Sequence, residues 1–326
     1  MKLARRKFLH LAAGAVALPA ILRVARAQTY PRRPITMIVG YAAGGLTDSL
    51  ARILAEPMRR SLGQAIIIEN VSGADGSIGV GRLVRARPDG YTIELGPVDS
   101  HVFTGGFYSL PYDLVTDFAP ISPVARTTDV LFARKTIPAS DFKGLIAWLK
   151  SNPNKASAGV ASVAFRVLTA LFQKETGTQL TFVPYRGAAP AIQDLVAQNI
   201  DLVFAAPDQL PFFQAANVKA IAVTSDTRLK VSSELPTFAE MGLPTLSFSA
   251  WFGVFAPKST PQDIISKLNA AITDALTDPA VRSRIADLGI DVFPREQLTP
   301  EALGSLVKAD IEKWWPIMKN FGIKAE

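Results

Sequence analysis

Strand-like and helix-like segments alternate along almost the whole chain, and this alternation constrains the fold more than any other feature of the sequence. Short apolar runs at residues 35–39, 156–159 and 180–184 are each followed by a stretch with the helical spacing of apolar side chains. Strands that alternate with helices in this way are typical of parallel sheets covered by helices. The sequence therefore predicts an α/β fold with mainly parallel sheets flanked by helices.

The order of the segments also predicts two lobes. Residues 126–247 contain their own set of strands and helices, and the last part of the chain returns to an apolar strand at 251–256 and three helices. We expect lobe 1 to comprise residues 28–125 plus 248–326 and lobe 2 to comprise residues 126–247. Two crossover strands would then form a hinge, and a ligand would bind in the cleft between the lobes at the carboxyl ends of the strands.

The first 27 residues have the features of an export signal. Arg5 and Arg6 precede an apolar run at residues 11–22, and the small-x-small sequence 25–27 follows it. The apolar run is much shorter than the roughly 20 residues that span a bilayer. We expect a twin-arginine type signal peptide, cleaved after Ala27, and a periplasmic mature protein, although Ala4 stands where Ser or Thr is usual.

The composition excludes several classes of function. Removing the six basic residues of the signal lowers the formal net charge from +7 to +1, so a basic surface for nucleic acid or acidic lipid is not supported. The chain has no cysteine and two histidines, of which His10 lies in the signal. One remaining histidine is too few for a typical zinc site or a histidine-supported triad. We expect no metal, no cofactor and no catalytic residues.

Residues 34–52, PITMIVGYAAGGLTDSLAR, contain the first candidate site. A buried-looking strand at 35–39 leads into Ala42, Ala43, Gly44 and Gly45, and a helix is expected from residue 46. Small residues leave the backbone open to a ligand. N–H groups at the start of a helix carry partial positive charge, so this loop predicts a binding site for a carboxylate or a phosphate.

Several motifs resemble one family over essentially the whole mature chain. They are YPRRPITMIVGYAAGGLTDSLAR, IIIENVSGADGSIG, ARPDGYTIELG, FVPYRGAAPAIQDL, LPTFAEMGLP, WFGVFAPKSTP and DPAVRSRIADLGID. Together they resemble the solute-binding proteins of tripartite tricarboxylate transporters, the Bug family. The resemblance implies a two-lobed periplasmic binding protein of type II-like architecture. Such a protein closes around a small organic acid and passes it to a membrane permease.

The resemblance also implies which residues of the first lobe bind the ligand. They are Tyr41, Ala43, Gly44, Gly45 and Asp48 on the first loop, and Ser100 and His101 on the loop after the strand at 91–95. Asp48 can cap the helix or reach the ligand through water. A lone histidine such as His101 is equally often a structural hydrogen-bonding residue. Residues 73–79 are glycine-rich, but no Lys-Ser or Lys-Thr follows them, which favours a structural turn over a phosphate loop.

The second lobe is expected to contribute a further set of ligand-binding residues. They are Ser162, Phe165, Arg166, Gly187, Ala188, Ala189, Ala205 and Asp208. Gly187 to Ala189 precede a helix and form a second site of backbone donors. Asp208 either binds through its side chain or caps a helix.

Two departures from the family pattern bear on the choice of ligand. Relatives commonly have small residues and Ser or Thr followed by His before a helix, where this chain has Ser162-Val163-Ala164-Phe165-Arg166. They also commonly have Asp after a strand, where this chain has Ala205. An arginine matches a carboxylate and a phenylalanine can pack against an apolar body, whereas the missing acid removes a partner for an ammonium group. We therefore expect an aromatic acid or a dicarboxylate rather than an amino acid. The alternative is a surface arginine and a core phenylalanine.

The leading prediction is a monomeric protein that captures a solute for the permease of a tripartite tricarboxylate-type transporter. Two other functions remain as alternatives. One is a ligand-sensing module for a membrane kinase, which needs the same ligand-dependent closure of the lobes. The other is an exported hydrolase that uses Ser100 and His101. Adjacent Ser and His residues do not by themselves form a nucleophile and base pair, and the chain has no G-x-S-x-G motif, so the hydrolase is disfavoured.

Overall fold

The computed structural model describes residues 30–324 with the exception of 140 and 186, and it leaves the side chain of Asp208 undescribed. The expected export signal lies outside the described residues. Residues Arg33–Glu326 form one compact unit, and all of the elements described below belong to it.

The first sheet has six strands in the order β11-β4-β10-β3-β1-β2. Their bounds are β1 (Ile35–Val39), β2 (Ile66–Asn70), β3 (Thr92–Pro97), β4 (Phe118–Thr127), β10 (Ala250–Pro257) and β11 (Asp291–Val292). Strand β1 is parallel to β2 and β3. Strand β10 is antiparallel to both β3 and β4, and β11 is antiparallel to β4.

The second sheet has five strands in the order β7-β6-β8-β5-β9. Their bounds are β5 (Val130–Ala133), β6 (Ala156–Val160), β7 (Leu180–Pro184), β8 (Leu202–Ala205) and β9 (Lys219–Val223). Strand β6 is parallel to β7 and β8, whereas β5 is antiparallel to β8 and β9.

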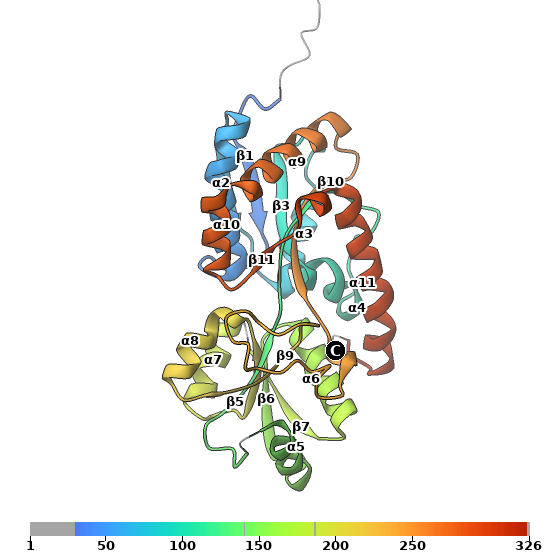
Figure 1. The fold of residues 1–326 in the computed structure, drawn as a ribbon. Helices are drawn as coiled ribbons and strands as arrows, with labels where there is room; N and C mark the ends of the chain where they lie inside the picture. Colours follow the sequence, from blue (N-terminus) through green and yellow to red (C-terminus); the bar gives the residue numbers. More distant parts are fainter. Residues whose placement is uncertain (1–29, 140, 186, 325–326) are drawn as a thin grey trace, which may run out of the picture. The chain divides into compact units, whose positions relative to one another are not determined.

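Both sheets are therefore mixed, which corrects the expectation of mainly parallel sheets. Strand β4 leaves the first sheet and continues almost directly into β5 of the second, and β10 brings the chain back (Figure 1). A strand that leaves a lobe and a strand that returns to it run in opposite directions, so their pairing is antiparallel. The prediction that two crossover strands connect the two sets of strands agrees with this arrangement.

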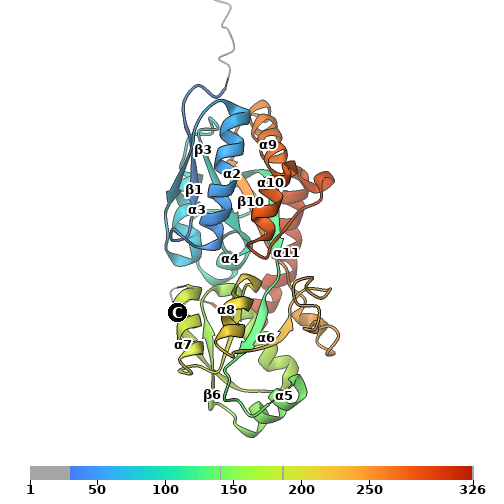
Figure 2. The same cartoon turned by 60° about the vertical axis from the view of Figure 1, so that its left-hand side comes forward.

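Helices cover both sheets (Figure 1). The longer helices are α2 (Leu46–Leu62), α3 (Ser77–Val84), α5 (Phe142–Ser151), α6 (Val163–Thr176), α7 (Ala188–Val196), α9 (Gln262–Thr277), α10 (Pro279–Ala286) and α11 (Pro300–Asn320). Shorter ones are η1 (Ala74–Gly76), η2 (Asp99–Phe103), α4 (Thr104–Phe107), η3 (Pro207–Gln209), α8 (Leu210–Ala215), η4 (Pro244–Leu246) and η5 (Arg295–Gln297). Helix α2 packs against α9 and α10, which come from the other end of the sequence (Figure 2).

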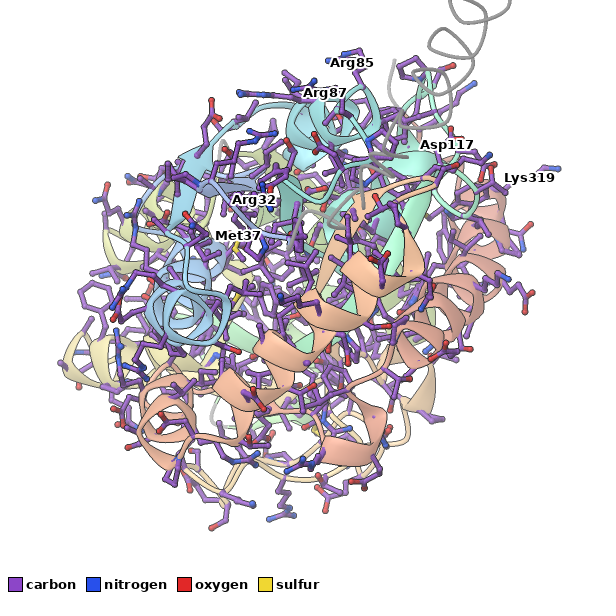
Figure 3. The ribbon with its side chains drawn as sticks, turned by 90° about the horizontal axis from the view of Figure 1, so that it is seen from above. Arg32, Met37, Arg85, Arg87, Asp117 and Lys319 are labelled. Atoms are coloured by element: carbon purple, nitrogen blue, oxygen red, sulfur yellow. The ribbon has the colours of Figure 1, made fainter. Side chains whose placement is uncertain are left out.

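Apolar side chains of the central strands form the core. Met37 of β1 has no exposed surface and lies inside the molecule in the view from above, whereas Arg85, Arg87 and Lys319 lie at its edge (Figure 3). In the C-terminal helix α11, Trp314 is fully buried and its ring centroid lies 5.3 Å from that of Phe103. Within the described part of the chain, no helix combines the length and the apolar character that crossing a membrane requires.

Candidate functional site

The loop between β1 and α2 exposes its backbone as the sequence predicts. Gly44 and Gly45 are exposed, and Gly45 is the N-cap of α2 without any side-chain capping bond. Gly44 has a φ of 85°, a conformation that glycine adopts without strain, and a Cβ atom added there would meet nothing within 4 Å. The first N–H groups of α2 have no acceptor within the helix, so the loop can accommodate an anion.

Asp48 fixes the shape of this loop. Its Oδ2 accepts hydrogen bonds from the Gly44 N–H at 2.9 Å and from Arg52 Nε at 2.8 Å, and its Oδ1 accepts one from Asn70 Nδ2 at 3.0 Å. Asp48 is 3% exposed, and its bond with Arg52 is the main reason why its pKa falls to about 2. Both carboxylate oxygens of Asp48 take part in these contacts, so Asp48 holds the loop in place through hydrogen bonds. This role differs from the two predicted alternatives, a helix cap and a water-mediated contact with the ligand.

Tyr41 lies next to the second loop of the first sheet. Its hydroxyl donates to the Asp75 carbonyl oxygen at 2.9 Å and is also hydrogen-bonded to the Ser100 side chain. The two loops meet at Gly76, where an added Cβ atom would lie 2.9 Å from the Ser100 Cβ atom and 3.1 Å from the Tyr41 ring. A glycine at position 76 therefore permits this close approach.

Ser100 and His101 are both fully buried. The Ser100 hydroxyl lies 3.0 Å from His101 Nδ1, and the His101 ring stacks on Phe255 with 3.9 Å between centroids. His101 Nε2 lies 3.6 Å from a carboxyl oxygen of Glu94, which is also fully buried. Burial lowers the pKa of His101 to about 3, so its imidazole is uncharged near neutral pH, and burial raises the pKa of Glu94 well above its ordinary value. These contacts are those of a structural histidine.

The start of α6 receives acidic side chains from the loops of the first sheet. Ser162 caps the helix by accepting from the Phe165 N–H at 3.3 Å. The Ala164 N–H donates to Asp99 Oδ1 at 3.3 Å, and Asp75 accepts a hydrogen bond from the Val163 N–H. Asp75 and Asp99 are thus functional candidates that the sequence analysis missed. The available signal was Asp99, an acid directly before the expected ligand-binding residues Ser100 and His101.

Arg166 lies one turn into α6 and is partly buried, as is Phe165. Its guanidinium carbon is 5.8 Å from the ring centroids of both Phe107 and Phe182. Arg166 also lines a cavity of about 700 Å³ between α6 and the C-terminal residues. The other lining residues are Ala170, Gln173, Lys174, Thr178, Gln179, Phe182, Phe321, Gly322, Ile323 and Lys324. The residues of the two glycine loops are not among them.

The loop before α7 forms the second set of predicted backbone donors. Gly187, Ala188 and Ala189 are exposed, and Gly187 is an N-cap with a φ of 105° and no side-chain capping bond. Ala205 is 1% exposed at the end of β8, where its methyl group belongs to the core of the second sheet. Asp208 lies in η3, and its side chain is outside the described part of the structure. The structure thus brings together Tyr41, Ser100 and the start of α6.

The side chains that could hold a metal ion are described for residues 30–139, 141–185 and 187–324, except that of Asp208. Within these ranges, no cluster of three or more His, Asp or Glu side chains is placed to hold a metal ion.

Residues 50–323 match the family model described as the tripartite tricarboxylate transporter family receptor, TctC. The chain belongs to this family. Solved structures agree with the assignment. The periplasmic binding protein BugD is 35% identical, has a TM-score of 0.82, and the match covers 91% of this chain and all of that one. MatC from Rhodopseudomonas palustris with bound malate is 33% identical with a TM-score of 0.81 over 88% of this chain and 99% of MatC.

A third TctC-type structure is R. palustris Rpa4515 with adipate, which is 30% identical with a TM-score of 0.83 over 91% of this chain and all of Rpa4515. These findings confirm the resemblance that the sequence motifs indicated, and they confirm the two-lobed α/β fold of periplasmic binding proteins. The TctC family consists of solute-binding receptors, and its structurally known members include periplasmic proteins.

Proposed function

We propose that this TctC-family receptor captures a small organic carboxylate, with an aromatic acid or a dicarboxylate favoured, and delivers it to the permease of a tripartite tricarboxylate-type transporter. The observation that carries the proposal is the exposed start of α2, where Gly45 caps the helix without a side chain and the space around Gly44 is open. Backbone N–H groups at such a helix start favour an anion. The malate of MatC and the adipate of Rpa4515 support a dicarboxylate.

The proposed mechanism is closure of the two lobes around the ligand, with no chemical reaction. We assign residues 28–125 plus 248–326 to the first lobe and residues 126–247 to the second. A ligand that contacts both lobes favours the closed form by its differential interactions with that form. Micromolar affinity corresponds to about −8 kcal/mol, which several charge-assisted hydrogen bonds can supply.

The remaining parts of the proposal concern the protein's location and assembly. We place the mature protein in the periplasm as a monomer, after export by a twin-arginine type signal and cleavage after Ala27. The arginine pair and the 25–27 sequence support this part. Amino-terminal sequencing of the exported protein would test the cleavage position.

Binding of adipate, malate and benzoate to the mature protein, measured by thermal shift and titration calorimetry, tests the capture of a carboxylate. We expect at least one of them to bind, and Gly45→Leu to abolish that binding because a leucine side chain would cover the start of α2. Gly45 has a φ of −78°, so the substitution causes no backbone strain. Gly304→Ala in α11 is the control, since its Cβ atom would make only an ordinary 3.5 Å contact with Pro120. Full binding by Gly45→Leu would rule out the assigned loop, and no binding of any carboxylate would contradict the function.

A further inference from the structure

Asp99 and Asp75 join the first lobe to the start of α6 in the second lobe. The Ala164 N–H donates to Asp99 Oδ1 at 3.3 Å, and the Ser162 side chain is also hydrogen-bonded to the Asp99 carboxylate. Asp75 accepts from the Val163 N–H. These N–H groups belong to the first turn of α6 and have no acceptor within the helix. The first lobe therefore places two of its own carboxylates where α6 would hold an anion.

The loops that carry these two acids are held rigidly in place. Asp75 has a left-handed conformation, with a φ of 51° and a ψ of 39°, and its Oδ2 accepts from the Tyr108 hydroxyl at 3.0 Å. Asp99 begins η2, which packs against β3, η1, α4, α6 and α11. Because both acids belong to the first lobe and α6 belongs to the second, their contacts with α6 require the two lobes to touch.

Burial and mutual repulsion make it unfavourable for both Asp75 and Asp99 to be ionised, and their hydrogen bonds to α6 offset this free-energy cost only in part. Burial, followed by the charge of Asp75, raises the pKa of Asp99 to about 6. Burial also raises the pKa of Asp75, although the Tyr108 hydroxyl and the Val163 N–H act in the opposite direction. Neither acid forms a salt bridge in the described part of the chain.

The surroundings of the pair contain little compensating charge. Burial shifts the pKa of each neighbouring titratable group towards its uncharged form, upwards for Tyr41, Glu94 and Tyr108 and downwards for His101. Helix α11 contacts η2 through Trp315, whose indole N–H donates to the Val102 carbonyl oxygen. Among the described residues, Arg166 is the cation whose charge acts on Asp75, and it lies between two aromatic rings.

We propose that Asp99, together with Asp75, couples closure of the lobes over a carboxylate ligand to the uptake of one proton from solution. This inference rests on the proposed capture of a carboxylate. The ligand would bring a further negative charge to a cleft that already holds two. A neutral Asp99 removes one of these charges, and its carbonyl oxygen can still accept from the Ala164 N–H. The proton binds to Asp99 on closure and returns to solvent on opening, so no other reactant is needed.

The sign of the pH dependence follows from the two states of Asp99. In this structure, where the lobes touch, burial raises the pKa of Asp99 to about 6. We expect separation of the lobes to solvate the side chain and return its pKa to the ordinary value. The closed form therefore binds the proton more tightly, and closure becomes more favourable as the pH falls through 6. This difference makes binding about fourfold tighter at pH 5.5 than at pH 7.5.

Titration calorimetry with adipate and benzoate tests the proposal in the wild-type protein. Measurements at pH 6 in two buffers with different ionisation enthalpies give the number of protons taken up. We expect between about half a proton and one proton per ligand, because Asp99 passes from ionised to at least half protonated. The affinity for benzoate should rise by about fourfold from pH 7.5 to pH 5.5. Equal heats in the two buffers would overturn the proposal and leave carboxylate capture intact.

Asp99→Asn assigns the effect to one residue. The amide has the same shape without the charge, so this variant should bind at pH 7.5 at least as tightly as the wild type does at pH 5.5, with no buffer dependence. The control Asp226→Asn changes an exposed aspartate and should retain the wild-type proton uptake. Proton uptake that persists in Asp99→Asn would overturn the role of Asp99.

Spin labels measure closure without any ligand. The chain has no cysteine, so Ser266→Cys in α9 and Lys143→Cys in α5 provide two unique sites on exposed positions of the two lobes. We expect the share of short distances to be larger at pH 5.5 than at pH 7.5, and independent of pH in the Asp99→Asn background. If no carboxylate binds, capture fails, and this experiment still decides the role of Asp99: identical distances at both pH values would overturn it.

Discussion

The loops before α2 and α7 have the same pattern of strand, glycine and helix, but they are held in different ways. In the first lobe, Asp48 accepts hydrogen bonds from the Gly44 N–H, from Arg52 and from Asn70. In the second lobe, Gly187 begins α7, a helix that has no acidic residue in its first turn. The loop before α2 is therefore held in place, or braced, by the side chain of Asp48, an acid in the first turn of the helix, whereas α7 has no acid at the equivalent place.

From this difference we infer that the two lobes recognise different parts of the ligand. A braced loop presents its N–H groups in a fixed geometry, so less conformational freedom is lost when an anion binds. A loop without such bracing can adjust to the part of the ligand that lies beyond the carboxylate. We expect the first lobe to recognise the carboxylate and the second lobe to accommodate the body of the ligand.

Asp48→Asn should remove the side-chain contacts that hold the first loop, and we expect it to lower the stability of the fold more than the other substitutions do. The pKa of Asp48 is lowered to about 2, chiefly by its hydrogen bond with Arg52, and a shift of this size corresponds to about 2 kcal/mol of stability at neutral pH. A carboxyl group whose pKa is lowered by folding stabilises the fold at pH values above its ordinary pKa. This stabilisation is lost as the pH falls towards 2. Urea unfolding should therefore show a loss of about 2 kcal/mol at pH 7 that shrinks below pH 5. Equal stability at pH 7 would show that the loop does not depend on this brace.

The sequence predicted the elements that carry the site because periodicity and helix starts are local signals. The helices expected after the strands at 156–159 and 180–184 correspond to α6 and α7, and the glycines at 44, 45 and 187 lie at helix starts as expected. The direction of strand pairing was less predictable, because it depends on where the chain crosses between sheets. The strands β4 and β10 look like ordinary apolar runs in the sequence.

The contacts of single polar residues could not be predicted, since they depend on segments far apart in the chain. His101 lies in the core because Phe255, from the returning strand β10, stacks on its ring. Asp75 reaches α6 because Gly76 allows the Tyr41 and Ser100 loops to approach each other closely. Nothing near these residues in the sequence indicates either partner. The same reason explains why the sequence did not predict the contact of Asp99 with α6.

Gly187→Ala should destabilise the second loop by a smaller amount than Asp48→Asn destabilises the first. Gly187 has a φ of 105° and a ψ of 171°, a region that is almost restricted to glycine, and an added Cβ atom would meet nothing within 4 Å. The cost is therefore backbone strain alone, and we expect about 1 kcal/mol in urea unfolding. Gly45→Ala is the matched control in the first lobe, because its φ of −78° suits alanine. Equal losses in the two variants would mean that backbone conformation does not separate the two loops.

Tyr185→Phe should have the smallest effect and should report on the second loop alone. The Tyr185 hydroxyl donates to Asp194 Oδ2 at 2.6 Å and so ties the end of β7 to α7. Asp194 also accepts from Asn199, and the pair lies near solvent, so losing the hydroxyl should leave the urea midpoint almost unchanged. Amide exchange at Ala188 and Ala189 should nevertheless become faster than in the wild type, while exchange at Gly44 stays the same. Unchanged exchange at Ala188 and Ala189 would mean that this bond does not restrain the loop, and the contrast with the Asp48 brace would then be larger than the structure indicates.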